Sequence, residues 1–248
     1  MTTAPQVEHP RTIRSYVIRG GRLTNSQQHA LDNYWQKYGI EDVNAPIDCG
    51  ALFGRQAPVV MEIGFGMGDS LLAMARSNPD KDFIGVEVHK PGVGRLLHEI
   101  DALSLSNLRI YCHDAKEILQ HCVADNALDT VQIFFPDPWH KKKHHKRRLI
   151  QPAFVAMLCS RLAPGGYLHC ATDWQPYAEQ MLEVLGAEPA GADVFVEYAD
   201  STTSAGSTNG PLAMALQAVK AGMSVADMRA MLDLRPRLSV RSQAAEVL

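Results

Sequence analysis

The chain has 248 residues, of which 46% are hydrophobic and 21% are charged, and its formal net charge is −3. This length is enough for one α/β domain of ordinary size or for two small ones. No apolar run approaches the roughly 18–20 residues that a membrane-spanning helix needs, and residues 1–15 lack the apolar core of a secretory signal. We therefore expect a cytoplasmic protein with no membrane association.

The segment 1–57 is predicted to be a basic arm (residues 1–23) followed by one helix. The arm carries the arginines Arg11, Arg14, Arg19 and Arg22. Thr24, with Gln27 three residues later, is typical of a capping box and predicts a helix that ends near Tyr38. A loop rich in proline and glycine is expected to follow, as far as about Pro58.

The segment 58–197 alternates short apolar strands with helical stretches. Strands are predicted at 57–64, 82–89, 107–114, 130–137 and 165–173, and helices at 69–78, 90–105, 115–123, 149–164 and 174–185. Strands separated in this way pair in parallel through right-handed crossovers. Their continuous hydrophobicity indicates burial on both faces. We predict an α/β fold with a doubly wound, mostly parallel sheet that binds its ligand at the carboxyl ends of the strands.

A glycine-rich turn, Glu62-Ile-Gly64-Phe-Gly66-Met-Gly68, joins the first strand to its helix. Glycine suits a backbone that takes unusual dihedral angles or closely approaches a ligand. Nicotinamide-binding folds use G-x-G-x-x-G instead, with a pyrophosphate at the helix start. The alternating spacing therefore disfavours an oxidoreductase, and we assign Gly64, Gly66 and Gly68 to a cofactor site.

Two carboxylates follow the next two predicted strands. Glu87 is placed to bind the two hydroxyls of a ribose, and Asp114 to meet the amino group of an adenine. The alternative is that each side chain only caps the helix that follows it.

The stretch 131–150, VQIFFPDPWHKKKHHKRRLI, combines a strand end with dense positive charge. Prolines flank Asp137 and stiffen its loop, while Trp139 offers either a stacking face for a purine or packing against the sheet edge. The basic residues are Lys141, Lys142, Lys143, Lys146, Arg147 and Arg148. Their position beside the strand end favours contact with RNA phosphates over an ordinary solvated surface. Because these cations surround His140, His144 and His145, we expect no metal there.

These motifs, together with RSYVIRGGRLTNSQ in the arm and TDWQPYAEQM after the fifth strand, resemble the bacterial tRNA (guanine-N7)-methyltransferase family over residues 11–187. The resemblance implies a Rossmann-like methyltransferase fold, S-adenosylmethionine as methyl donor and tRNA as partner. It implies that Glu62, Glu87, Asp114 and Asp137 line the donor site, that Asp137 is catalytic, and that Lys141 and Asp173 contact the guanosine.

The segment 198–248 departs from this family. It begins with a linker-like stretch, DSTTSAGSTNGP, continues with alanine- and methionine-rich sequence, and contains no Thr-x-x-Glu element. We expect a helical or disordered tail that adds no strand to the sheet, and we interpret it as a lineage-specific tail or the product of a reading-frame change.

The leading hypothesis is methyl transfer from S-adenosylmethionine to N7 of a guanosine in the tRNA variable loop. The alternative is a protein that binds RNA and the donor but turns over little because its carboxyl-terminal part is altered. The sequence leaves open whether the protein is a monomer or a homodimer.

Overall fold

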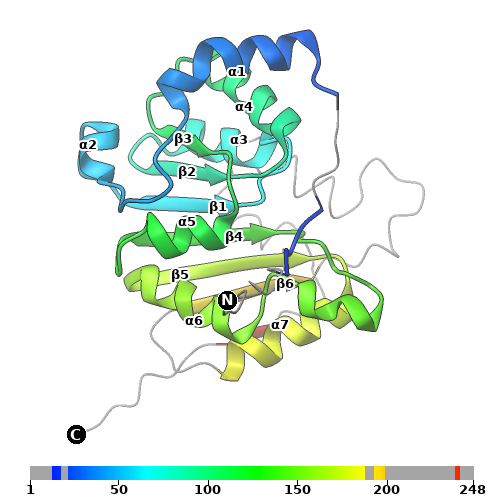
Figure 1. Ribbon diagram of the computed structural model, residues 1–248. Coiled ribbons are helices and arrows are strands. Elements are labelled where there is room, and N and C mark those ends of the chain that lie inside the picture. Colours follow the sequence, from blue (N-terminus) through cyan, green and yellow to red (C-terminus); the bar gives the residue numbers. More distant parts are fainter. Residues whose placement is uncertain (1–12, 18–21, 188–192, 199–237, 241–248) are drawn as a thin grey trace, which may run out of the picture.

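The computed structural model describes residues 13–17, 22–187, 193–198 and 238–240. Its centre is one sheet in the order β3-β2-β1-β4-β5-β6-β7 (Figure 1). The strands are β1 Val59–Ile63, β2 Asp82–Val86, β3 Leu108–Tyr111, β4 Leu128–Phe134, β5 Leu162–Thr172, β6 Asp193–Tyr198 and β7 Leu238–Val240. Pairs from β1 to β6 are parallel, and β7 is antiparallel to β6. The predicted α/β fold with a mostly parallel sheet is confirmed.

The helices form a layer on each face of the sheet (Figure 1). They are α1 Asn25–Tyr38, α2 Cys49–Phe53, α3 Asp69–Ser77, α4 Lys90–Ala102, α5 Ala115–His121, α6 Pro152–Arg161 and α7 Gln175–Ala187, with a 3-10 helix, η1, at Lys142–Arg147. Helices α1, α3 and α4 share one buried core with the sheet, and α5, α6 and α7 share the other. No helix in the described ranges is long and apolar enough to cross a membrane.

Strands β1 and β2 are buried along their whole length, as their nearly continuous apolar sequence predicts. Neighbouring residues of β1 point to opposite layers: Val60 packs with α3 and α4, and Met61 packs with α5 and α6. Helices therefore cover both faces of this strand.

Helix α1 begins as the capping box predicts. The Thr24 hydroxyl accepts from the Gln27 amide at 3.2 Å, and the Thr24 amide donates to the Gln27 side chain at 2.9 Å. The helix packs against α4, and its Ala30 and Tyr38 are buried in the α3/α4 core. The sheet and this helix therefore share a core.

Three expectations about the elements are wrong. Helix α2 lies inside the stretch predicted as a loop. The 3-10 helix η1 in the basic segment was not predicted either way. Strand β5 begins at Leu162 rather than at the predicted Gly165, and its pairing with β4 shifts register between Leu128 and Thr130. The expectation that the tail 198–248 adds no strand is wrong, because β7 lies within it; β6 was not predicted. The remaining tail predictions, for 199–237 and 241–248, fall outside the described residues.

Candidate active site

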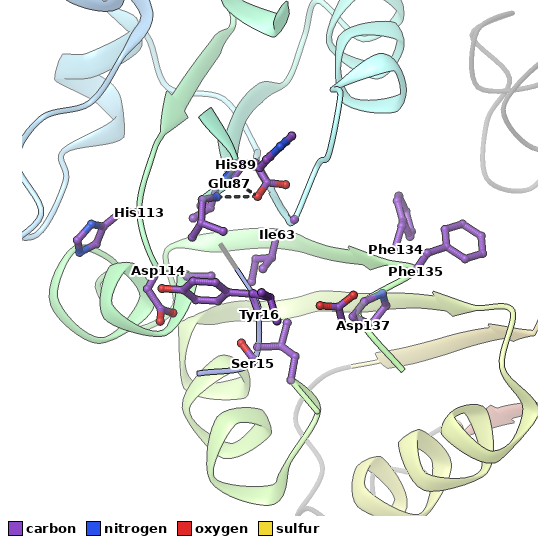
Figure 2. A pocket seen from close by; sticks show the side chains of 17 residues that line it. Ser15, Tyr16, Ile63, Glu87, His89, His113, Asp114, Phe134, Phe135 and Asp137 are labelled. Atoms are coloured by element: carbon purple, nitrogen blue, oxygen red, sulfur yellow. Dashed lines mark hydrogen bonds between the residues drawn. The ribbon is translucent and has the colours of Figure 1, made fainter. Parts of the chain in front are cut away.

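A cavity of about 390 Å³ lies at the carboxyl ends of β1 to β4 (Figure 2). Its lining comes from the first four strands and from the arm: Ser15, Tyr16, Val17, Ile63, Gly64, Val86, Glu87, Val88, His89, His113, Asp114, Ala115, Phe134, Phe135, Pro136, Asp137 and Leu149. Glu87, Asp114 and Asp137, each predicted from a separate strand end, thus surround one cavity. Figure 2 shows their side chains around the ring of Tyr16.

The glycine turn needs its glycines for two different reasons. Gly64, Gly66 and Gly68 have φ angles of 76°, 59° and 82°, a region that other residues rarely adopt. A side chain on Gly64 or Gly66 would meet no neighbouring atom, which leaves open space above the turn. A Cβ on Gly92 would lie 1.9 Å from the Gly66 carbonyl oxygen, so α4 also packs directly on the turn. Gly64 lines the cavity, whereas Gly66 and Gly68 are not among the residues that line it.

Glu87 fixes the turn as well as lining the cavity. Its Oε2 accepts from the Gly66 amide at 2.9 Å, and its Oε1 accepts from the amides of Val88 and His89 at 2.6 and 2.9 Å. Three backbone donors therefore orient this carboxylate before any ligand arrives.

Glu62 directly precedes Ile63, which lines the cavity, but Glu62 itself is not a lining residue. Its side chain is 3% exposed, and its Oε2 has no hydrogen-bond partner within the part of the chain that the structure describes. Burial, reinforced by the nearby charge of Glu87, raises the pKa of Glu62 to about 8. This carboxyl group is thus predominantly protonated at neutral pH.

Asp114 has two structural roles. It caps α5 by accepting from the Lys116 amide at 2.9 Å, and it also lines the cavity. The side chain of Tyr16 lies next to Asp114 (Figure 2), and desolvation, followed by the charge of this carboxylate, raises the pKa of Tyr16. The arm therefore forms one wall of the cavity.

Asp137 sits in a strained loop between Pro136 and Pro138. Phe135 and Trp139, on either side of this Pro-Asp-Pro unit, have φ angles of 51° and 46°, which costs on the order of 1–3 kcal/mol for each residue. The Phe135 amide donates to the Ala171 carbonyl at 2.8 Å and holds the loop to the end of β5. Asp137 is exposed on this rigid support.

Trp139 is occupied by the arm and by a neighbouring arginine. Its indole N–H donates to the Ser15 carbonyl at 3.0 Å, and the Arg147 guanidinium lies 3.8 Å from a centroid of its ring. Arg147 in turn donates to the carbonyls of Arg14 and Tyr16 at 3.1 and 3.2 Å. We name this set of contacts the arm clasp. It favours packing over purine stacking for Trp139.

The basic segment divides into exposed lysines and engaged arginines. Lys141, Lys142, Lys143 and Lys146 are exposed on and before η1. Arg148 is 2% exposed; it donates to the Pro138 carbonyl at 2.8 Å and to the Gln180 side chain, and it stacks on Tyr177 at 4.7 Å. The expectation that Arg148 contacts RNA phosphates is therefore wrong, because burial removes it from the surface.

Comparisons with known proteins place the chain in a family. The family model described as "Putative methyltransferase" matches residues 56–208. A tRNA (guanine-N(7)-)-methyltransferase of Alcanivorax borkumensis is 59% identical over 71% of this chain and 74% of its own length. One of Methylobacillus flagellatus is 58% identical over 76% of this chain and 80% of its own. The chain belongs to the bacterial tRNA (guanine-N7)-methyltransferase family.

Among solved structures, that of the 16S rRNA methyltransferase KamB aligns at a TM-score of 0.42 and 17% identity. The alignment covers 56% of this chain and 63% of that one.

Two residues that the family resemblance assigns to the guanosine lie outside the cavity lining. Lys141 precedes η1, and Asp173 directly follows β5; both are exposed. They lie in the segments that follow neighbouring strands, β4 and β5, so they border the same sheet edge as Asp137.

Sequence reasoning missed Tyr16 and Phe135 as cavity residues. Tyr16 stands in the RSYV stretch that carries part of the family resemblance, and this was the available signal. Phe135 was counted as the end of a buried strand, because nothing in the letters FF distinguishes its half-exposed ring from that of Phe134. His89 and His113 also line the cavity, each next to a predicted carboxylate.

Proposed function

We propose that this protein transfers a methyl group from S-adenosylmethionine to N7 of a guanosine in the variable loop of tRNA. The observation that carries the proposal is the convergence of Glu87, Asp114 and Asp137 on one cavity in a chain of this family. Open α/β sheets bind ligands at this edge, and three carboxylates there suit a cationic nucleoside rather than a pyrophosphate.

The donor site fits the residues present. S-adenosylmethionine supplies, when bound, a methyl carbon activated by a sulfonium. Glu87 and Asp114 are the proposed contacts for its ribose and adenine, and the open space above Gly64 and Gly66 admits a ligand close to the backbone. Glu62 is buried and lies outside the cavity lining, so it is not proposed as a direct contact of the donor.

Asp137 is proposed to orient the guanine and to stabilise the charge that develops on it. N7 carries a lone pair and no hydrogen, so no proton must be removed before attack. The chain's task is therefore alignment and electrostatic stabilisation. The Asp137 carboxylate can accept a hydrogen bond from the N1–H or amino group of guanine, and its rigid loop limits the reorganisation that this requires.

The exposed lysines of the basic segment are the proposed contacts for the tRNA backbone. Lys141, Lys142, Lys143 and Lys146 project from the segment that directly follows the Asp137 loop. A phosphate bound there would lie next to the cavity, which is the arrangement that an RNA-modifying enzyme needs.

The test is methyl transfer to unmodified tRNA with a radiolabelled donor, followed by nucleoside analysis for 7-methylguanosine. Asp137→Asn keeps the shape of the side chain and removes its charge. It should lower kcat by about 100-fold to 1000-fold, by analogy with the loss of one transition-state contact, while leaving donor affinity within a few-fold of the parent. Asp80→Asn, an exposed acid in the turn before β2, is the matched control.

Two outcomes would contradict the proposal. If Asp137→Asn methylates at the parent rate, Asp137 does not stabilise the reaction. If the parent binds the donor and tRNA but forms no 7-methylguanosine, the binding protein with little turnover becomes the better description.

A further inference from the structure

The exposed aromatic rings near the cavity differ from the one that the sequence suggested. Trp139 is held in the arm clasp, with its N–H bonded and one face covered by Arg147. The aromatic residues Phe135 and Trp174 remain 40% and 37% exposed. A base that leaves the RNA stack needs an open ring face, and among the described phenylalanine, tyrosine and tryptophan residues these are the two most exposed.

Phe135 has the position that stacking requires. It lines the cavity, it stands two residues before Asp137, and its amide is fixed to Ala171. Figure 2 shows its ring on the same side of the cavity as Asp137 and outside Phe134. Phe135 and Asp137 therefore border the same part of the cavity.

The backbone of Phe135 supports a role beyond packing. Its φ of 51° lies in the left-handed region, which is uncommon for a residue with a large side chain. Burial of a phenylalanine ring would offset the free-energy cost of this backbone conformation, but Phe135 is 40% exposed. Strain of this kind persists where the surrounding fold imposes it, and it is concentrated at binding sites.

Trp174 is less suited to the task. It does not line the cavity, and the ring of His140 packs against it edge-on, with 4.3 Å between the ring centroids. It therefore lies outside the rim and serves as the rival residue in the test.

We propose that the ring of Phe135 is the stacking platform for the target guanine, and that Trp139 instead anchors the arm. This inference rests on the proposed function and adds a substrate-binding residue to it. The platform and the Asp137 carboxylate then act on the same base, one on its face and the other on its edge.

The variants test the effect of removing the ring of residue 135 while the strain in its backbone stays similar. Phe135→Leu and Phe135→Met remove the ring but, like phenylalanine, are not β-branched, so the left-handed conformation costs them a similar amount. Phe135→Tyr retains the ring. Trp174→Leu removes the rival ring. Thermal unfolding of each variant shows whether the fold is intact.

The ringless variants should lower kcat/KM for tRNA by roughly 5-fold to 150-fold, the range that corresponds to losing one base–aromatic stack. Phe135→Tyr should stay within about threefold of the parent, and the Kd of S-adenosylmethionine, measured by calorimetry, should be unchanged in all variants. A tRNA with 2-aminopurine at the target position gives a readout without turnover: its fluorescence should be more quenched by the parent and by Phe135→Tyr than by Phe135→Leu.

The proposal is overturned if the ringless variants match Phe135→Tyr in both kcat/KM and quenching, or if Trp174→Leu alone produces the loss. Failure of the proposed function looks different, because the parent itself would then form no 7-methylguanosine.

Discussion

At the scale of single residues, burial favours the protonated form of Glu62. Glu62 and Gln132 occupy paired positions on β1 and β4, and both are 3% exposed. Among the described residues, Glu62 Oε2 and Gln132 Oε1 each lack a hydrogen-bond partner. An ionised carboxylate without a partner is costly to bury, so burial and the nearby charge of Glu87 raise the pKa of Glu62.

This protonation makes stability depend on pH. The pKa of Glu62 is about 8 in the folded protein, against 4.5 ordinarily, so the folded state holds the proton more tightly. The contribution to the free energy of unfolding is complete below about pH 4.5 and is lost as the pH rises to about 8. Urea unfolding at pH 6 and pH 9 should show a larger loss for the parent than for Glu62→Gln, which cannot ionise. Equal losses would show that Glu62 is ionised throughout.

At the scale of elements, η1 presents its lysines to solvent and turns its arginines towards the protein. Arg147 binds the arm and Arg148 is buried against α7 and the Asp137 loop. The run of basic letters therefore contains two kinds of residue, and only the exposed kind can release counterions from RNA.

The lysines should thus control the salt dependence of tRNA binding. Replacing Lys142, Lys143 and Lys146 together with glutamine should weaken binding and reduce the slope of log Kd against log salt concentration by roughly 2–3. Filter binding between 50 and 200 mM salt measures this slope. Arg76→Gln, an exposed arginine in the last turn of α3, should leave it unchanged. An unaltered slope in the triple variant would exclude η1 as the phosphate contact.

At the scale of the whole molecule, ligand binding and folding are linked through the cavity, since its walls come from four strands and the arm. S-adenosylmethionine at a concentration 100 times its Kd should raise the free energy of unfolding by about 2.7 kcal/mol. For a chain of this size the Tm then rises by roughly 5–10 °C. Thermal scans with and without the donor measure the shift. A larger shift with NADH would point to a nicotinamide enzyme instead.

The alternating strands and helices between Val59 and Ala187 could be predicted from sequence, because each has a strong local signal of apolar pattern, cap or breaker. Short elements could not: α2 has five residues in a loop-like context, and β7 has three. Strand β6 precedes a linker-like stretch that obscured it. Their pairing depends on neighbouring strands that are distant in sequence.

The candidate site divides in the same way. Glu87, Asp114 and Asp137 were predictable because parallel strands bring their carboxyl ends together whatever the details of packing. The burial of Arg148 and the occupied face of Trp139 were not, because they depend on partners such as Gln180 and Ser15 in distant parts of the chain. Charge and ring type are visible in a sequence, but exposure is a property of the folded neighbourhood.

The arm clasp has a consequence for how the enzyme is completed during synthesis. Ser15 is synthesised early, but the indole N–H of Trp139, which donates to its carbonyl oxygen, lies 124 positions later in the chain. The arm can therefore form its wall of the cavity only after β4 and the segment that follows it have been synthesised. A fragment ending before that segment would already contain the glycine turn, yet it would lack the docking point that brings Tyr16 to Asp114.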